Sequence, residues 1–184
     1  MRKPVRYAVT AAVLAGALAA CGGTSAPASA PSAAPAAPAS SRPAAAAPGI
    51  GATLHVTGVD CGTTAVNVKL VKVTDPSAPD NSLDAASAGH RLIAVVLRIT
   101  GASGTTSSDA NNSAVLIGAN GQTYQTAIGG VAGYTNFNSG DYTVSPGQSS
   151  VGAVAFQVPD GVKVSSVQFA GCQYSGTPAT WKVR

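Results

Sequence analysis

The pattern of hydrophobic and polar positions changes at about Ile50. From there to the end of the chain, short runs of β-branched residues alternate with Gly, Asn, Asp, Ser and Pro, and no stretch shows a helical period. Alternation with a period of two is typical of strands that bury one face. We therefore expect residues 50–184 to form one all-β domain of about seven to nine strands, long enough to bury a single core.

The clearest predicted strand covers residues 90–100 and is apolar on both faces. One face carries Ile93, Val95, Leu97 and Ile99, and the other carries Leu92, Ala94, Val96 and Arg98. Strands that are covered on both sides have such nearly continuous apolar runs. The pattern predicts a central strand that is buried on both faces until Arg98, which lies at the edge of the core.

Weaker alternation predicts seven further strands, at residues 52–59, 64–73, 113–118, 122–126, 150–158, 163–170 and 181–183. Asn120-Gly121 lies between two of these strands, and both residues accept the positive φ of a tight hairpin turn. Pro159-Asp160-Gly161 predicts another turn between strands.

Two segments, residues 75–89 and 127–141, are too rich in Gly, Ser, Asn and Asp to be strands. Loops of this length are uncommon and often carry function. We expect any binding surface to lie there. The alternative is that both are tolerated loops of a surface-exposed protein.

The first twenty residues have the pattern of a lipoprotein signal peptide. Arg2, Lys3 and Arg6 precede about fourteen uncharged residues, which suits a signal-peptide core, whereas a transmembrane helix needs about twenty. The Leu18-Ala19-Ala20-Cys21 run resembles a lipobox, so we expect cleavage after residue 20, a lipid anchor on Cys21 and a location on the extracytoplasmic face of the cell membrane. The alternatives are an ordinary signal peptide and an N-terminal membrane helix.

Residues 21–49 predict a tether. After Cys21 they consist almost entirely of Ala, Pro, Ser and Gly, without a large apolar side chain, so they cannot bury enough surface to offset the entropy of ordering. At about 3.1 Å per residue, an extended Ala/Pro chain of this length could reach roughly 80 Å. We expect a disordered spacer between the membrane and the folded domain.

The charge balance argues against nucleic acid as a partner. The formal net charge of the chain is +4, but Arg2, Lys3 and Arg6 leave with the signal peptide and Arg42 lies in the tether, so residues 50–184 have a net charge of about zero. The remaining basic residues are scattered along the sequence rather than clustered, as expected for solvated faces.

Lipidation of Cys21 would leave an even pair of cysteines, Cys61 and Cys172, in an oxidising compartment. We expect them to form a disulfide, which closes a loop of about 110 residues and contributes up to about 4.7 kcal/mol in the chain-entropy model. Two separate buried thiols are the alternative. A redox-catalytic role is not expected because the chain has no Cys-x-x-Cys motif.

Candidate metal sites are weak. His55 and His90 are the only histidines and have no carboxylate nearby in sequence, so we expect them to be structural and expect no metal or other cofactor. Oxygen ligands for Ca²⁺ could come from Asp75, Asp80, Asn81 and Asp84, but the EF-hand pattern is missing. A turn in which Asp and Asn bond their own backbone is the simpler interpretation.

Catalytic signatures are also missing from the sequence. There is no Gly-x-Ser-x-Gly elbow, no phosphate-binding loop and no outstanding pair of acids, so we expect no catalytic residues. Aromatic residues that could line a sugar or peptide groove, though they more often pack in a core, are Tyr124, Tyr134, Phe137, Tyr142 and Trp181.

Two motifs within residues 88–170 resemble an envelope-protein family. Residues 119–124, with Asn120-Gly121 and Tyr124, resemble the family's hairpin, and residues 146–159, from Pro146-Gly147 through Phe156 to Val158-Pro159, resemble its "P-G-x-x-x-x-G-x-x-x-F-x-V-P" strand. The family is an immunoglobulin-like domain of unknown function in Gram-positive and actinobacterial lipoproteins, similar in plan to a secreted mycobacterial immunoprotective antigen. The chain departs from it at Thr100-Gly101-Ala102, where the family usually has Asn in the turn.

The resemblance implies an immunoglobulin-like antiparallel β-sandwich and no catalytic residues. We expect a non-catalytic binding module for an envelope protein or glycan. The alternatives are a passive structural or accessory lipoprotein and, as a remote third, a hydrolase of cell-wall polymers, since one fold hosts many functions.

Overall fold

The computed structural model describes residues 46–137, 139–172 and 177–183. The predicted signal peptide, Cys21 and most of the predicted tether lie outside the described residues. Within the described part, no helix is long and apolar enough to cross a membrane. The strands are β1 (Thr53–Thr57), β2 (Ala65–Ser77), β3 (His90–Ser103), β4 (Thr106–Asp109), β5 (Ala114–Gly118), β6 (Thr123–Ala127), β7 (Asp141–Val144), β8 (Ser149–Pro159), β9 (Val164–Phe169) and β10 (Ala179–Lys182). Two short helices, η1 (Ser82–Asp84) and α1 (Ala110–Ser113), connect strands.

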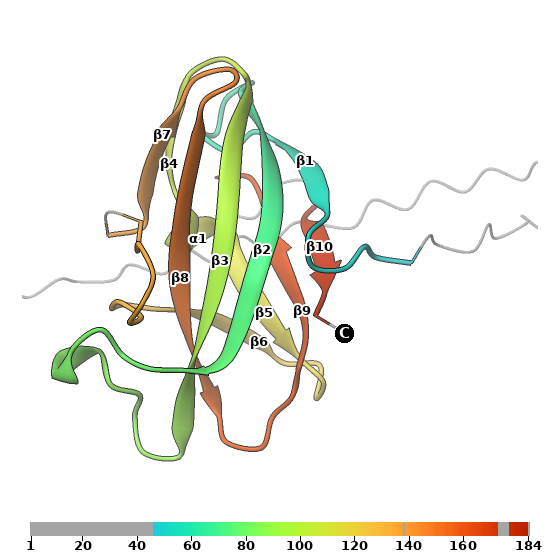
Figure 1. Cartoon of the computed structure of the whole chain (residues 1–184). Helices are drawn as coiled ribbons and strands as arrows, with labels where there is room; N and C mark the ends of the chain where they lie inside the picture. The colour runs from blue at the N-terminus through green and yellow to red at the C-terminus, as the bar shows by residue number, and fades with distance from the viewer. Residues whose placement is uncertain (1–45, 138, 173–176, 184) are drawn as a thin grey trace, which may run out of the picture. The chain divides into compact units, whose positions relative to one another are not determined.

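Eight of these strands form one antiparallel sheet in the order β1-β2-β3-β8-β6-β5-β9-β10. The first three residues of β6 pair with β5, and Thr126 and Ala127 pair with β8. The sheet therefore folds over at β6 into two layers, with β1, β2, β3 and β8 in front of β5, β9 and β10 (Figure 1). The predicted all-β sandwich is confirmed, while the described residues contain ten strands, slightly more than the seven to nine expected, because of an additional two-stranded sheet.

The inner faces of the two layers form the main core. Ile93, Val95, Leu97 and Ile99 of β3 lie in it, as the alternation of that strand predicts, and they pack with Phe156, Phe169 and Trp181. The indole Nε1 of Trp181 donates a hydrogen bond to the carbonyl oxygen of Ala52 at 2.9 Å, which ties β10 to the start of β1. Each large apolar side chain buried here contributes about 1.5–3 kcal/mol.

The structure differs from the expected elements in the β4–β7 ribbon, a separate two-stranded sheet. Both strands have only four residues. β4 is entirely polar, and β7 has just two apolar positions, Tyr142 and Val144, so the pattern is too short to identify either as a strand. Their pairing is supported by a 2.7 Å hydrogen bond between the Ser107 and Thr143 hydroxyls. In addition, β2 continues to Ser77, into the segment expected to be a loop.

Cys61 and Cys172 are joined by a disulfide, which is the pairing that the sequence predicts. The bond connects the turn after β1 to Cys172, three residues after the end of β9, across a sequence separation of 111 residues. It therefore fastens the front layer to the rear layer at one end of the sandwich.

Candidate functional site

The two segments that the sequence singles out as loops lie side by side in the structure. Pro79 and Val131 form an antiparallel bridge. The amide of Asp80 donates to the carbonyl of Gly130 at 3.1 Å, and the amide of Ala132 donates to the carbonyl of Ala78 at 2.9 Å. We call the surface formed by residues 78–84 and 128–136 the paired-loop surface.

A second hydrophobic cluster holds the paired-loop surface against the front layer. It consists of Leu92, Ala94, Val96, Val131, Ala153 and Ala155, with Ala86, Ala127 and Tyr134 partly buried against it. Leu92, Ala94 and Val96 are the second apolar face of β3, so the loops cover the side of the central strand that faces away from the main core. The loops are therefore held by buried contacts rather than only by their ends.

Tyr134 fastens the second loop to β2. Its hydroxyl bonds the Thr74 hydroxyl at 2.5 Å, and the Lys72 Nζ lies 5.6 Å from the centre of its ring. The hydrogen bond from Thr74 and the neighbouring Lys72 lower the pKa of the Tyr134 phenol. A cation over an aromatic face is attractive, so this contact stabilises the loop on the sheet.

Arg91 fixes the base of the first loop. Its Nε and Nη2 donate to the two carboxylate oxygens of Asp75 at 2.6 and 2.9 Å, and the same guanidinium donates to the carbonyls of Pro159 and Val162 at 2.7 Å. A bidentate pair of this kind fixes geometry as well as charge. Asp75 is thus a partner of Arg91 rather than a neighbour of the other loop carboxylates.

The tip of the first loop is a hydrogen-bonded turn. The Asn81 side chain accepts from the Leu83 amide at 2.8 Å and donates to the Asp84 carboxylate at 2.7 Å. These bonds form the cap of η1, the turn that the sequence favours over a Ca²⁺ loop. In the described part of the chain, no group of three His, Cys, Asp or Glu side chains is placed to hold a metal ion.

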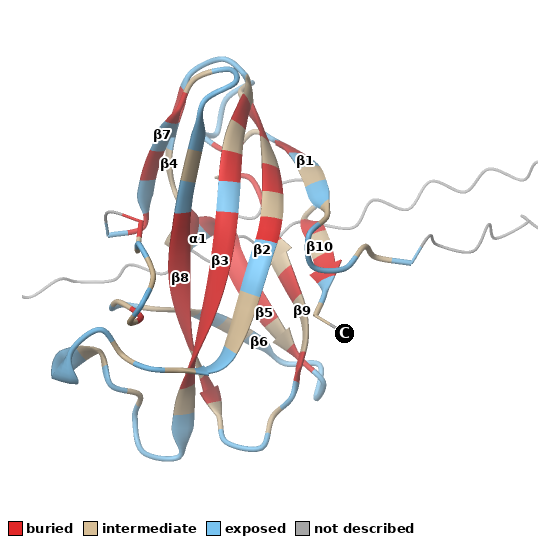
Figure 2. Ribbon diagram, in the orientation of Figure 1, coloured by how far each residue is buried: buried red, intermediate tan, exposed pale blue. Residues whose placement is uncertain are grey.

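Each loop presents one fully exposed aliphatic side chain. Leu83 on η1 is 94% exposed and Ile128 is 101% exposed, whereas the other exposed large apolar side chains are at most 44% exposed. Residues 81–83 of the turn that carries Leu83 are exposed, and most of the projecting loop is pale blue in Figure 2. Gly129 has a φ of +133°, and a Cβ there would lie 2.6 Å from the Asp84 carboxylate, so the close approach of the loops requires glycine at this position.

A groove of about 530 Å³ lies next to Ile128. It is lined by Asn111, Ile128, Gly129, Gly130, Asn136, Phe137, Ser139, Gly140 and Ala153, none of which is charged. The side-chain Oδ1 of Asn136 accepts from the backbone amide of Val131 at 3.2 Å, and the side-chain Nδ2 of Asn111 donates to the backbone carbonyl of Ser139 at 3.2 Å. These walls of small residues and amides suit a neutral group, such as an aliphatic side chain or a peptide backbone.

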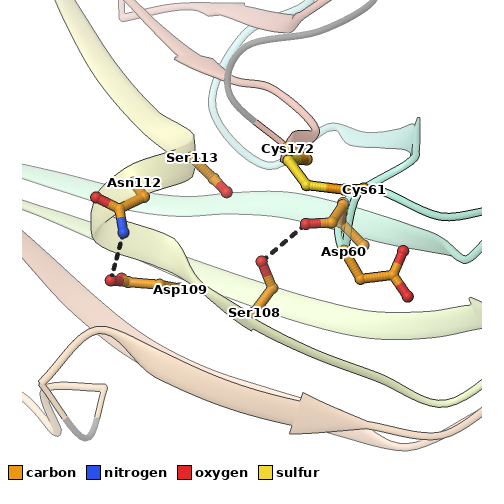
Figure 3. Close-up of a pocket in the computed structure, with 8 residues that line it drawn as sticks. Asp60, Cys61, Ser108, Asp109, Asn112, Ser113 and Cys172 are labelled. Carbon is orange, nitrogen blue, oxygen red and sulfur yellow. Dashed lines mark hydrogen bonds between the residues drawn. A yellow bond between two sulfur atoms is a disulfide. The ribbon is translucent and has the colours of Figure 1, made fainter.

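Another hollow, of about 550 Å³, lies beside the disulfide (Figure 3). The Ser108 hydroxyl in its wall donates to the Val59 carbonyl at 2.8 Å, and the Asp109 carboxylate accepts from the Asn111 amide and from the Asn112 side chain. Ser108 therefore bonds a carbonyl rather than a general base, and Asp109 acts as a helix cap. The arrangement is not that of an activated nucleophile.

The histidines and aromatic residues that the sequence singles out do not gather at one site. The His55 Nδ1 bonds the Asn67 side chain at 3.0 Å on the strand surface, while the His90 Nδ1 lies 3.3 Å from the Ala88 carbonyl. Trp181, Tyr142 and Phe137 are buried in the main core, and Tyr124 packs against it, while Tyr134 belongs to the second cluster. The sequence missed the pairing of the two loops, for which the apolar second face of β3 was the available signal.

Among the described residues, Tyr142 on β7 has the most strongly shifted side-chain pKa. Its hydroxyl is buried without a hydrogen-bond partner, and burial raises its pKa to about 12. The neighbouring Ser108 hydroxyl, which itself donates to the Val59 carbonyl, lowers the pKa and offsets this effect in part. The residue contributes to the core beneath the β4–β7 ribbon and not to a reactive site.

Comparison with known proteins supports the fold alone. No protein-family model and no curated protein sequence matches this chain. The folded part is similar to a candidate lipoprotein from Bacillus subtilis, with a TM-score of 0.50 and 13% identity over 70% of this chain and 37% of the other. It is also similar to an uncharacterized β-sandwich protein from Clostridium difficile 630, with a TM-score of 0.44 and 11% identity over 73% of this chain and 91% of the other. The chain thus spans little more than a third of the Bacillus protein's length.

Proposed function

We propose that the protein is a lipid-anchored lipoprotein of the cell envelope, whose β-sandwich is a non-catalytic interaction module that binds a protein partner through the paired-loop surface. The observation that carries the proposal is the pair of fully exposed aliphatic side chains, Leu83 and Ile128, on loops that a buried cluster fastens to the sheet. Preformed loops lose little conformational freedom on binding, so exposed apolar residues on them are effective contacts.

The anchor part of the proposal rests on the lipobox at Cys21 and on the tether that follows it. The Bacillus neighbour is itself named as a candidate lipoprotein, which agrees with this assignment. Membership of the immunoglobulin-like envelope family, expected from residues 119–124 and 146–159, remains part of the same proposal.

A protein partner is favoured over a glycan by the chemistry of the surface. Its two fully exposed large side chains, Leu83 and Ile128, are aliphatic, and the residues that line its groove are uncharged. Phe137 in the groove wall is 6% exposed, so no open aromatic platform is offered to a sugar ring. A non-catalytic role agrees with the bonding of Ser108, His55 and His90, none of which pairs with an acid or base that would activate it.

The test is site-specific photo-crosslinking of the full-length chain in intact cells. A crosslinking residue at position 83 or 128 should give one dominant protein adduct, and the same residue at the exposed position 50 should not. The double variant Leu83→Ser, Ile128→Ser should reduce retention of that partner about a hundredfold, because burying two aliphatic side chains contributes about 3 kcal/mol or more. Ile50→Ser is the matched control.

Three outcomes would contradict the proposal. Unchanged retention by the double variant would favour the passive surface role. A glycan adduct at positions 83 and 128 would replace the protein partner. Turnover of cell-wall polymer by the purified chain, removed by a single Asp→Asn change, would establish the hydrolase.

A further inference from the structure

The outer face of the front layer is covered by the paired loops at one end only. In the other half, two rows of side chains cross the sheet in register. One row consists of Thr53, Lys69, Arg98 and Val151, and the next consists of His55, Asn67, Thr100 and Ser149. Both rows alternate with buried inward positions, as the exposed bands on β3 and β8 show (Figure 2). This half of the sheet is therefore open at its outer face.

Two cations face each other directly on this surface. Lys69 of β2 is the register partner of Arg98 of β3, and Lys72 lies further along β2. Like charges directly opposite each other on neighbouring strands are destabilising. None of the chain's seven aspartates lies in these rows, and the chain has no glutamate. Among the described residues the ion pair is Arg91 with Asp75, so Lys69, Lys72 and Arg98 are not neutralised by an acid of the domain.

The same surface also exposes aliphatic side chains. Val71 is 39% exposed beside Lys72, and Val151 is 40% exposed beside Arg98. We define the basic face as Lys69, Val71, Lys72, Arg98 and Val151. Basic residues mixed with exposed apolar ones are typical of surfaces that lie on a bilayer, where the cations meet anionic headgroups.

We propose that the basic face rests on the anionic lipid surface of the membrane that carries the chain. The inference rests on the anchor part of the proposed function and does not use the exposed loop residues Leu83 and Ile128, although Lys72 also contacts Tyr134 of the paired-loop surface. Twenty-five positions separate Cys21 from the first described residue, which at about 3.1 Å per residue allow a reach of roughly 75 Å, so the anchored domain can turn any face to the bilayer. Each Lys or Arg near an anionic surface favours contact about fivefold, so three favour this orientation about a hundredfold.

The test measures lysine reactivity in the full-length chain reconstituted into vesicles. Lysines are acetylated briefly and the modification of each is quantified by mass spectrometry, on vesicles of phosphatidylcholine alone and of phosphatidylcholine with about one third phosphatidylglycerol. Lys163, just before β9, and Lys182, in β10, are exposed on the rear layer and serve as internal controls. We expect the reactivity of Lys69 and Lys72 to fall at least fivefold on the anionic vesicles while Lys163 and Lys182 stay unchanged.

Added salt and one variant test whether the protection is electrostatic. About 0.5 M NaCl should restore the reactivity of Lys69 and Lys72, because screening shortens the range of the attraction to a few ångström. Arg98→Gln removes one cation from an exposed position and should weaken their protection about fivefold.

Several results would overturn the inference. Equal reactivity of Lys69 on both vesicle types would do so, as would an equal fall at all four lysines. A chain that fails to float with the vesicles would overturn the anchor and the inference together. Protection in intact cells but not on vesicles would replace the bilayer with an acidic macromolecule. Because partner capture at positions 83 and 128 is measured separately, failure of one proposal is distinguishable from failure of the other.

Discussion

Val131 is the residue on which the paired-loop surface depends most directly. It is fully buried, although it lies in a segment of the chain that the sequence predicts to be a loop. Val131→Ala removes two methyl groups from the cluster formed with Leu92 and Val96. At about 0.8 kcal/mol for each buried CH₂, the loops lose about 1.6 kcal/mol of their attachment to the sheet, before any contribution from the cavity that remains.

This loss should appear as local opening of the loops. A change of 1.4 kcal/mol is a tenfold change in an equilibrium constant, so about 1.6 kcal/mol raises the open population roughly fifteenfold. The amides of Asp80 and Ala132 report this opening, because each donates a hydrogen bond from one loop to the other.

The assay is amide hydrogen exchange of the wild-type chain and the variant under native conditions. Asp80 and Ala132 should exchange about fifteen times faster in Val131→Ala. Leu83→Ala is the matched control, because Leu83 is 94% exposed and its truncation should leave both exchange rates unchanged while it weakens partner crosslinking. Val131→Ala should weaken crosslinking too, although position 131 is buried.

Equal exchange rates of Asp80 and Ala132 in both proteins would show that the buried cluster does not hold the loops. Exchange of both amides in the wild-type chain as fast as in an unfolded peptide would show the same. Acceleration limited to amides of the main core, such as that of Val154, would mean that Val131 stabilises the whole domain rather than the loops.

Two further predictions concern stability. Reduction of the Cys61–Cys172 bond, which spans 111 residues, should lower the free energy of unfolding by about 2–5 kcal/mol in urea titrations with and without dithiothreitol, and a loss below about 1 kcal/mol would contradict a structural role. Burial raises the pKa of Tyr142 to about 12 in the folded chain, above the usual value of 10, so between these values the unfolded chain loses the phenol proton first. The stability that this group contributes is therefore fully present below pH 10, and the free energy of unfolding falls as the pH rises toward 12. Tyr142→Phe should reduce the pH dependence of urea unfolding between pH 10 and 12. At pH 7 it should leave the free energy of unfolding unchanged or higher by about 1 kcal/mol, because the buried hydroxyl has no hydrogen-bond partner. An unaltered pH dependence would contradict the raised pKa of Tyr142.

Local sequence signals account for most of the fold. The alternation in residues 90–100 correctly predicted the central position of β3, which lies between β2 and β8. Asn120-Gly121 correctly predicted the β5–β6 hairpin, although only Gly121, with a φ of +78°, and not Asn120 has a positive φ. These features were predictable because each depends on residues close together in the sequence. The β4–β7 ribbon was not, since its pairing relies on polar contacts such as Ser107 with Thr143.

The candidate site was predictable in its parts but not in its assembly. Composition identified both loops, yet nothing within residues 75–89 indicates that they contact residues 127–141. That contact is set by the fold, which brings Pro79 beside Val131. The second apolar face of β3 did carry a signal, since Leu92, Ala94 and Val96 require a cover. From the sequence alone that cover could equally have been another layer or a partner chain.

The two proposed surfaces constrain each other because they share the outer side of the front layer. Lys72 of the basic face lies over the ring of Tyr134, which fastens the paired-loop surface, so the two surfaces are adjacent. If the basic face rests on the bilayer, Leu83 and Ile128 are presented near the membrane rather than far from it. The partner should then be bound to the same membrane, and a partner free in the surroundings would instead favour a domain held away from the bilayer by its tether. The lysine reactivity and the identity of the crosslinked partner should therefore agree, and their disagreement would show which of the two surfaces has been misassigned.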